Sequence, residues 1–116
     1  MNSGFHECLA AGVTLFNAGQ WYEAHEVWEE AWKRESGPRR VLLQGLILVA
    51  AGWIQRNRGS PEGARVLFGR ALERLEPLPA IYEGVNVGVL LPQVRQWREG
   101  GTGESPRLLF TPTQEA

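Results

Sequence analysis

The chain has 116 residues, 43% hydrophobic and 22% charged, and its 13 acidic and 12 basic side chains leave a net charge of −1. This composition is typical of one globular domain with a hydrophobic core. All the acids are glutamates, and all the bases except Lys33 are arginines. The lack of aspartate excludes EF-hand loops, catalytic Asp dyads and Ser-His-Asp triads. The single Cys8 excludes an internal disulfide and a Cys-rich zinc site, and the near-zero charge gives no support to nucleic-acid binding.

The start of the chain does not resemble a secretory signal, because neither basic residues nor a long apolar run follow Met1. The most apolar stretch, residues 41–54, is too short to span a bilayer and contains Gln44. One unpaired cysteine fits a reducing compartment. We therefore expect a cytoplasmic protein without a membrane partner.

Two helices are predicted in the first third of the chain. Ser3 can cap the first, whose apolar residues recur on one helical face: Phe5, Leu9, Gly12, Val13 and Phe16. Gly19 can take the left-handed conformation that ends a helix. The second helix is expected from about Gln20 to Arg34, before the breaker sequence 36–38.

The third predicted helix, from about Pro38 to Arg58, is apolar on every side. Such a helix must be surrounded, so we expect the other helices to pack around it. Gly45 and Gly52 share one side of it, and each costs about 1 kcal/mol relative to alanine. We expect the close approach of a neighbouring helix to offset this cost. The alternative explanation of the apolar excess is an interface between two copies of the chain.

Two more helices complete the predicted fold. Residues 60–62 (Ser-Pro-Glu) open the fourth with a cap, a first-turn proline and an early acid, and Pro77 follows its end. The fifth lies within Val87–Glu99, where Pro92 leaves its start and straightness open. No segment has a strand pattern. The predicted fold is all-α: a compact bundle of four to five short helices around a buried central third helix.

The domain boundary is expected near residue 99. Residues 1–99 are predicted to form a single helical domain, and residues 100–116 a C-terminal tail that contains glycine and proline. The apolar cluster 108–110 (Leu-Leu-Phe) in this tail is either a flap that covers the bundle or an arm that reaches a neighbour.

The second predicted helix carries the polar residues of greatest interest. With about 100° per residue, Trp21, Trp28 and Trp32 fall within about 40° of one another. His25 lies on the same face, and Glu29 lies at its edge. The remaining glutamates of this helix point away from that face: Glu23, Glu26 and Glu30.

These positions have two interpretations. A buried imidazole needs hydrogen-bond partners, and Glu29 stands one helical turn from His25, so the first interpretation is a structural His-Glu pair in a tryptophan-rich core. The second is a small-molecule or metal site that uses His25, Glu26 and Glu29. The segment resembles the zinc-protease motif with glutamate replacing the second histidine, but a catalytic zinc needs three protein ligands and His6 is the only other histidine. We therefore assign no cofactor and no metal, and His25 and Glu29 are the only candidate metal ligands.

Two further features have simple explanations. The arginines at residues 39–40 and 56–58 are expected to solvate the ends of the third helix and to pair with glutamates of the second. Cys8 is expected to be a small core residue, because no base that would activate it can be identified.

Three segments resemble a known family. Residues 16–32 (FNAGQWYEAHEVWEEAW) resemble the signature of the family called domain of unknown function 309. Residues 43–52 and 59–64 are similar to its second segment, and residues 84–87 resemble its third motif. The resemblance covers about residues 5–98. It implies a small all-helical protein of bacteria, archaea and plastids, with no established reaction.

The resemblance also implies which positions share a site. Relatives often carry glutamine at the position of Leu48, histidine at or next to Ile54 and Gln55, and aspartate at the position of Asn86. Leu48 cannot bind a metal, and Asn86 is a weaker ligand than a carboxylate but a good helix cap. The candidate polar or ligand site therefore consists of His25, Glu26, Glu29, Gln55 and Asn86.

Two classes of function follow from these observations. The preferred one is a small helical binding or interaction module, as a homo-oligomer or with a protein partner, in which the His-Glu pair is structural. The alternative is a small ligand- or metal-binding protein or enzyme that uses His25, Glu26 and Glu29. The residues specify no substrate, and enzymatic activity is the less favoured interpretation.

Overall fold

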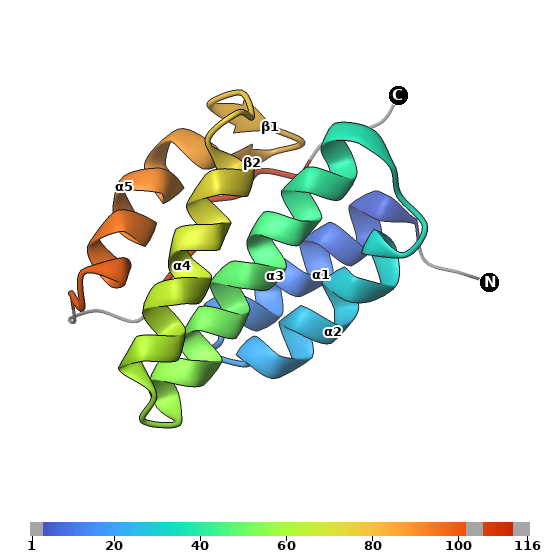
Figure 1. The fold of residues 1–116 in the computed structure, drawn as a ribbon. Helices are drawn as coiled ribbons and strands as arrows, with labels where there is room; N and C mark the ends of the chain where they lie inside the picture. Colours follow the sequence, from blue (N-terminus) through green and yellow to red (C-terminus); the bar gives the residue numbers. More distant parts are fainter. Residues whose placement is uncertain (1–3, 102–105, 113–116) are drawn as a thin grey trace.

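The computed structural model describes residues 4–101 and 106–112, and it confirms the all-α bundle (Figure 1). The central helix α3 lies between α2 and α4, α1 packs behind α2, and α5 flanks α4. None of the described helices has the length and apolar character needed to cross a membrane. The elements are α1 (Phe5–Asn17), α2 (Trp21–Trp32), α3 (Gly37–Asn57), α4 (Pro61–Leu75), β1 (Ile81–Tyr82), β2 (Val85–Asn86) and α5 (Val87–Arg98).

Helices α1 and α2 form the predicted helical hairpin. All five predicted apolar positions of α1 are buried, and Gly19 has a φ of 80° in the turn. The predicted cap Ser3 lies outside the described residues, and Gly4 precedes the first turn. Cys8 is a buried free thiol, as expected of a small core residue.

Trp28 joins these two helices at the centre of the core. Its side chain is fully buried, and its indole N–H donates a hydrogen bond to the carbonyl of Leu9 at 3.3 Å. A Cβ atom at Gly12 would overlap the indole ring. Glycine at this position therefore lets the largest buried side chain lie directly against the backbone of α1.

The two glycines of α3 mark the contact with α4, as predicted. A Cβ atom at Gly45 would stand 2.5 Å from Cδ2 of Leu75, and one at Gly52 would stand 2.5 Å from Cε1 of Phe68. The glycines therefore allow α4 to approach the backbone of α3 closely, and the packing of Leu75 and Phe68 offsets their cost in helix propensity.

The β1–β2 hairpin is a feature that was not predicted. Its turn consists of Glu83 and Gly84, with φ of 50° and 85°, which are the signs that a tight type I′ hairpin turn requires. A glutamate in this conformation costs about 1 kcal/mol or more. Its carboxylate is bound by the guanidinium of Arg39 and lies 3.7 Å from Nε2 of His6, so the turn is attached to α3 and α1.

Tyr82 at this turn predicts a pH dependence of stability. Burial of its phenol, reinforced by the Glu83 carboxylate, raises the pKa of Tyr82 above its ordinary value of 10.0. The folded chain then holds this proton more tightly than the unfolded chain. The contribution of Tyr82 to the free energy of unfolding is therefore complete below pH 10 and is lost as pH rises through the folded pKa. We expect Tyr82→Phe to weaken the alkaline decline of the free energy of unfolding, measured with urea at several pH values. Tyr22→Phe is the control, since Tyr22 is 53% exposed.

Helix α5 is continuous although Pro92 lies inside it. The side-chain oxygen of Asn86 accepts a hydrogen bond from the backbone N–H of Val89 at 3.0 Å and so caps its first turn. Pro92 removes the donor for the carbonyl of Gly88, and Gly88 is exposed to water. Pro92 therefore does not interrupt the helix, because this proline lies where an unbonded carbonyl can be solvated.

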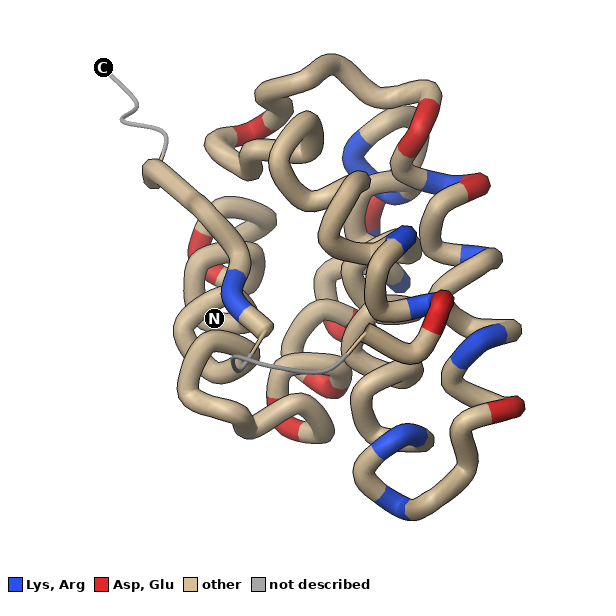
Figure 2. Tube along the Cα trace, turned by 90° about the vertical axis from the view of Figure 1, so that its left-hand side faces the viewer, with Lys and Arg blue, Asp and Glu red and all other residues tan. Residues whose placement is uncertain are grey.

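The C-terminal segment 106–112 lies on its own bundle. It passes behind α3 and α4 in Figure 1 and runs along the edge of the molecule in the side view of Figure 2. The backbone of Leu109 accepts a hydrogen bond from Asn86 at 3.0 Å, and Thr111 donates one to Gly84 at 2.8 Å. Leu108 is buried. Of the two alternatives left open by the sequence, the described part of the tail is a flap.

Asn17 fastens this flap to α1, and its removal has a predictable effect. Its amide donates to the carbonyl of Leu108 at 3.1 Å, and its side-chain oxygen accepts from the N–H of the same residue at 2.7 Å. Asn17→Ala leaves both backbone groups of the buried Leu108 without partners, so we expect a loss of about 1–3 kcal/mol. Hydrogen exchange at residues 108–111 should accelerate more than exchange in α3. Thr14→Ala, at an exposed position of the same helix, is the control.

The arginines that flank α3 bind partners other than those predicted. Arg39 pairs with Glu83, and the guanidinium of Arg40 lies 4.0 Å from the ring centroid of Trp32. Arg56 donates to the carbonyls of Trp97 and Gly101 at the end of α5. The expected pairing with glutamates of α2 is wrong for these arginines, because Arg39 lies at the hairpin, Arg56 lies at the end of α5, and Arg40 lies over an indole of α2.

Candidate functional site

The predicted His25–Glu29 pair forms on α2. Nε2 of His25 lies 2.8 Å from Oε1 of Glu29, but the two side chains are 27% and 40% exposed. The pair is half-buried rather than buried, because α2 packs through Ala24, Trp28 and Ala31, which turns His25 toward the outer surface. Such an exposed pair contributes about 0.3–0.5 kcal/mol.

The three tryptophans of α2 have different environments. Trp28 is fully buried, whereas Trp21 and Trp32 are half-buried at the α2–α3 boundary. Trp21 packs on Trp53 of α3, with ring centroids 5.5 Å apart. Four covered ring nitrogens have no hydrogen-bond partner within the described part of the chain: Nε1 of Trp21, Trp32 and Trp53, and Nδ1 of His25.

The structure does not bring the remaining candidate residues to this pair. Glu26 is exposed on the outward side of α2. Gln55 reaches toward α4, since its Oε1 lies 3.6 Å from the place of a Cβ atom at Gly63. Asn86 caps α5, and β2 lies at the opposite end of the bundle from the C-terminal turn of α3 (Figure 1). Among residues 4–101 and 106–112, no three His, Cys, Asp or Glu side chains are grouped to hold a metal ion.

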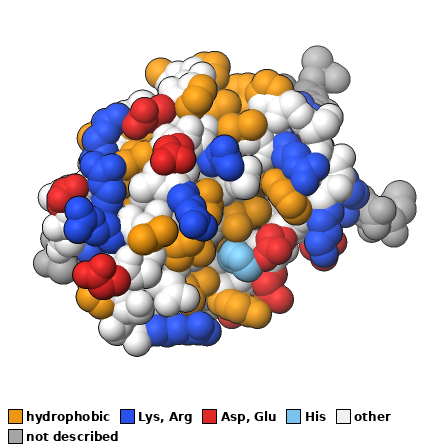
Figure 3. Space-filling model, viewed as in Figure 1, with side chains coloured by type: hydrophobic (Ala, Val, Ile, Leu, Met, Phe, Trp, Pro, Cys, Tyr) orange, Lys and Arg blue, Asp and Glu red, His pale blue; other side chains and the backbone are white. Residues whose placement is uncertain are grey.

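The outward side of α3, between α2 and α4, is only partly covered. The sequence predicted that other helices would pack all around α3. Neighbouring helices cover it on two sides, but this third side is incompletely covered. Hydrophobic side chains gather in the middle of this face, with charged ones around them (Figure 3). We call this set the outer stripe; all its members are partly exposed, and they are Gln44, Ile47, Leu48, Ala51, Ile54 and Gln55.

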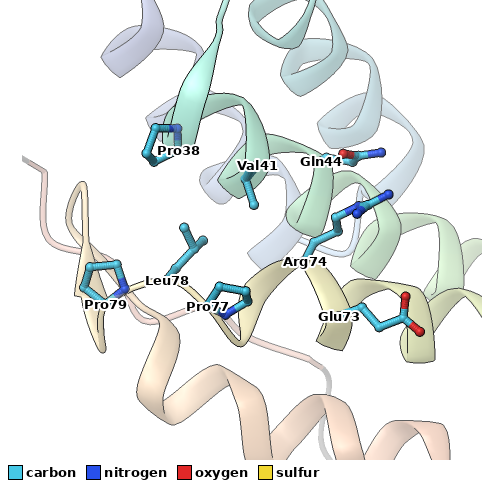
Figure 4. A pocket seen from close by; sticks show the side chains of 8 residues that line it. All are labelled: Pro38, Val41, Gln44, Glu73, Arg74, Pro77, Leu78 and Pro79. Carbon is cyan, nitrogen blue, oxygen red and sulfur yellow. The ribbon is translucent and has the colours of Figure 1, made fainter.

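A hollow lies at each end of the outer stripe. The first has a volume of about 440 Å³ and is lined by Pro38, Val41, Gln44, Glu73, Arg74, Pro77, Leu78 and Pro79 (Figure 4). Arg74 extends toward Gln44 across this hollow, whereas Glu73 points away from both. The second, of about 280 Å³, includes Trp21, Tyr22 and Ile54 at the C-terminal end of α3. The first hollow has mainly apolar walls with polar groups at its edge, which suits an apolar side chain of a partner. The second is more polar, since Gln20, Glu23, Asn57 and Arg58 also line it.

The charges on the two sides of the outer stripe have opposite sign, which the sequence analysis did not identify. Helix α2 contains four glutamates and no base, whereas α4 contains three arginines and two glutamates. Four of these residues form the acidic and basic borders of the stripe: by their helical angles Glu29 and Arg74 lie next to the stripe, and Glu26 and Arg70 lie one step farther out, on the exposed sides of α2 and α4. Within the described residues, Glu26, Arg70 and Arg74 have no ion-pair partner. The two sets of charges come from different helices, and they share one surface only because α2 and α4 flank α3.

Comparison with known proteins places the chain in a family. The model of the family described as domain of unknown function DUF309 matches residues 9–67, just over half of the chain. A solved structure, the conserved hypothetical protein TTHA0068 from Thermus thermophilus, is similar at 40% identity with a TM-score of 0.67. The similarity covers 78% of this chain and 94% of that chain. No curated protein matches significantly. The chain therefore belongs to the DUF309 family.

Proposed function

We propose that the chain is a cytoplasmic protein-interaction module rather than an enzyme, and that the outer stripe and its two charged borders form its docking surface. The observation that carries this proposal is the outward side of α3, which stays half-exposed although the helix is apolar there. Partly exposed apolar side chains that are contiguous and rimmed by charge are typical of protein interfaces. In this proposal the His25–Glu29 pair stabilises α2 and does not react.

The shape of the surface supports a helical or extended protein segment as its ligand. The outer stripe follows α3 between two flanking helices and connects the hollows of about 440 and 280 Å³ at its ends. An elongated, partly apolar surface of this kind accepts a helix that places apolar side chains at regular intervals.

Site-specific photo-crosslinking tests this proposal. A benzophenone amino acid placed at Ala51, in the middle of the outer stripe, should yield discrete protein adducts in cells that express the chain. The control is the same amino acid at Val89, which is 38% exposed on α5. The proposal is wrong if Ala51 gives no adduct, or if both positions give the same adducts.

A further inference from the structure

We propose that the docking surface binds a second copy of this chain, and that the two copies are related by a two-fold axis parallel to α3. This inference rests on the proposed function and specifies its partner. It is supported by the opposite charges of the two borders, by the symmetry of a two-chain complex, and by the positions of the charged residues along the axis of α3. We call this position the height of a residue.

The charges of this surface are complementary to themselves. Glu26 and Glu29 supply negative charge on the α2 border, and Arg70 and Arg74 supply positive charge on the α4 border. Three of these four groups have no ion-pair partner within the described residues, and Glu29 contacts only the partly exposed His25. A surface with one acidic and one basic border can satisfy both by meeting an identical surface in the correct orientation.

Symmetry decides between two orientations. If the two-fold axis runs parallel to α3, the rotation exchanges the two borders, so α2 of one copy faces α4 of the other and α3 faces α3. If the axis lies in the interface but perpendicular to α3, α2 faces α2 and α4 faces α4. The second orientation opposes like charges on both borders, which costs free energy. The charge distribution therefore selects the axis parallel to α3.

Contacts within one copy fix the height of the basic border. Gly45 lies against Leu75, and Gly52 lies against Phe68. Helix α4 therefore runs antiparallel to α3, and each step of one residue along α3 corresponds to a step of one residue along α4. By this register Arg74 lies at the height of Leu46, and Arg70 lies at the height of Ala50.

The acidic border has nearly the same height. Trp21 meets Trp53 and Trp32 meets Arg40, so Glu29 lies near the height of residue 44 and Glu26 near that of residue 47. Rotation about an axis parallel to α3 leaves these heights unchanged. Each glutamate of one copy therefore faces an arginine of the other within about 5 Å along the axis, which these long side chains can span.

The resulting contact has the composition of a stable interface. The outer stripes of two copies bury their apolar side chains against each other at the centre, and the ion pairs form the rim. A standard interface takes about 800 Å² from each partner, which is a modest part of the 6644 Å² that the chain exposes.

Charge reversal with sedimentation equilibrium tests the arrangement. The wild-type chain should be a dimer. Two double variants, Glu26→Arg with Glu29→Arg and Arg70→Glu with Arg74→Glu, should each dissociate, with Kd raised at least about tenfold by repulsion on both borders. An equimolar mixture of the two variants should form a heterodimer, because both of its borders are again attractive. The matched control, Glu7→Arg with Glu30→Arg, makes the same charge changes at exposed positions of α1 and α2 that line neither hollow, and it should dimerise like the wild type.

Three results would overturn the inference. The first is a wild-type chain that sediments as a monomer at about 100 μM, well above the micromolar Kd expected of a specific interface of this size. The second is a double variant that still dimerises, and the third is a mixture that stays monomeric although circular dichroism shows both variants folded. A monomer whose Ala51 crosslinks to a different protein would refute the second copy as partner and leave the proposed function intact.

Discussion

Trp28→Ala is expected to lower the free energy of unfolding by about 3–5 kcal/mol, the range for removing a buried aromatic side chain. The indole fills the space between α1 and α2, it packs 6.2 Å from the ring of Phe16, and it donates the hydrogen bond to Leu9. Replacement by alanine leaves a cavity and removes this donor. Urea unfolding followed by circular dichroism measures the loss. Trp32→Ala should cost clearly less, because Trp32 is half-buried under Arg40.

A double-mutant cycle with Gly12 tests the physical cause of this effect. In the wild-type chain Gly12→Ala should cost about 1–3 kcal/mol, because the new methyl group overlaps the indole. In the Trp28→Ala chain the methyl group enters empty space, so the same change should stabilise α1 by up to about 1 kcal/mol through helix propensity. Equal costs in the two backgrounds would contradict the contact that we describe.

Helix α1 was predictable because its apolar residues recur with a period that only a helix explains. The five apolar positions of α1 are all buried, and Gly19 ends that helix as expected. Gly45 and Gly52 were more informative than any apolar residue. An interior glycine weakens a helix, so a pair of them on one side indicates a neighbour that needs the space.

The hairpin and the flap were not predictable, because long-range contacts create them. Each strand has only two residues, which is too short for an alternating pattern. Val85 of β2 forms an antiparallel bridge with Phe110, and Asn17 binds Leu108 across most of the chain. The boundary near residue 99 stays a prediction.

The candidate site was predictable only in part, for a related reason. The spacing of His25 and Glu29 determines their contact, because it depends on one helix alone. Their exposure depends on where α1 and α3 pack against α2, which a helical wheel cannot show. Gln55 and Asn86 joined the candidate site through the family resemblance, and the structure gives Asn86 the capping role that its residue type also indicated.

The simultaneous replacement of Gly45 and Gly52 by alanine is the second large expected effect. Each new methyl group would stand 2.5 Å from a buried side chain of α4, so each costs about 1–3 kcal/mol. The sites lie about 10 Å apart along α3, so the costs should add to about 2–6 kcal/mol. Gly52→Ala should account for more of the loss, because Phe68 is a rigid ring whereas Leu75 can change rotamer. Thermal and urea unfolding of the single and double variants measure these values.

Gly69→Ala is the matched control for this prediction. It lies inside α4, and within the described residues a Cβ atom there would approach only Cδ of Arg98, at 3.9 Å, so alanine should stabilise the helix by up to about 1 kcal/mol. Losses of similar size at all three glycines would show that close packing of α3 on α4 is not the cause. The same packing holds Arg70 and Arg74 beside the outer stripe. In the Gly45→Ala and Gly52→Ala chain α4 must move outward, so any variant that still folds should also self-associate more weakly, although neither glycine lies on the docking surface.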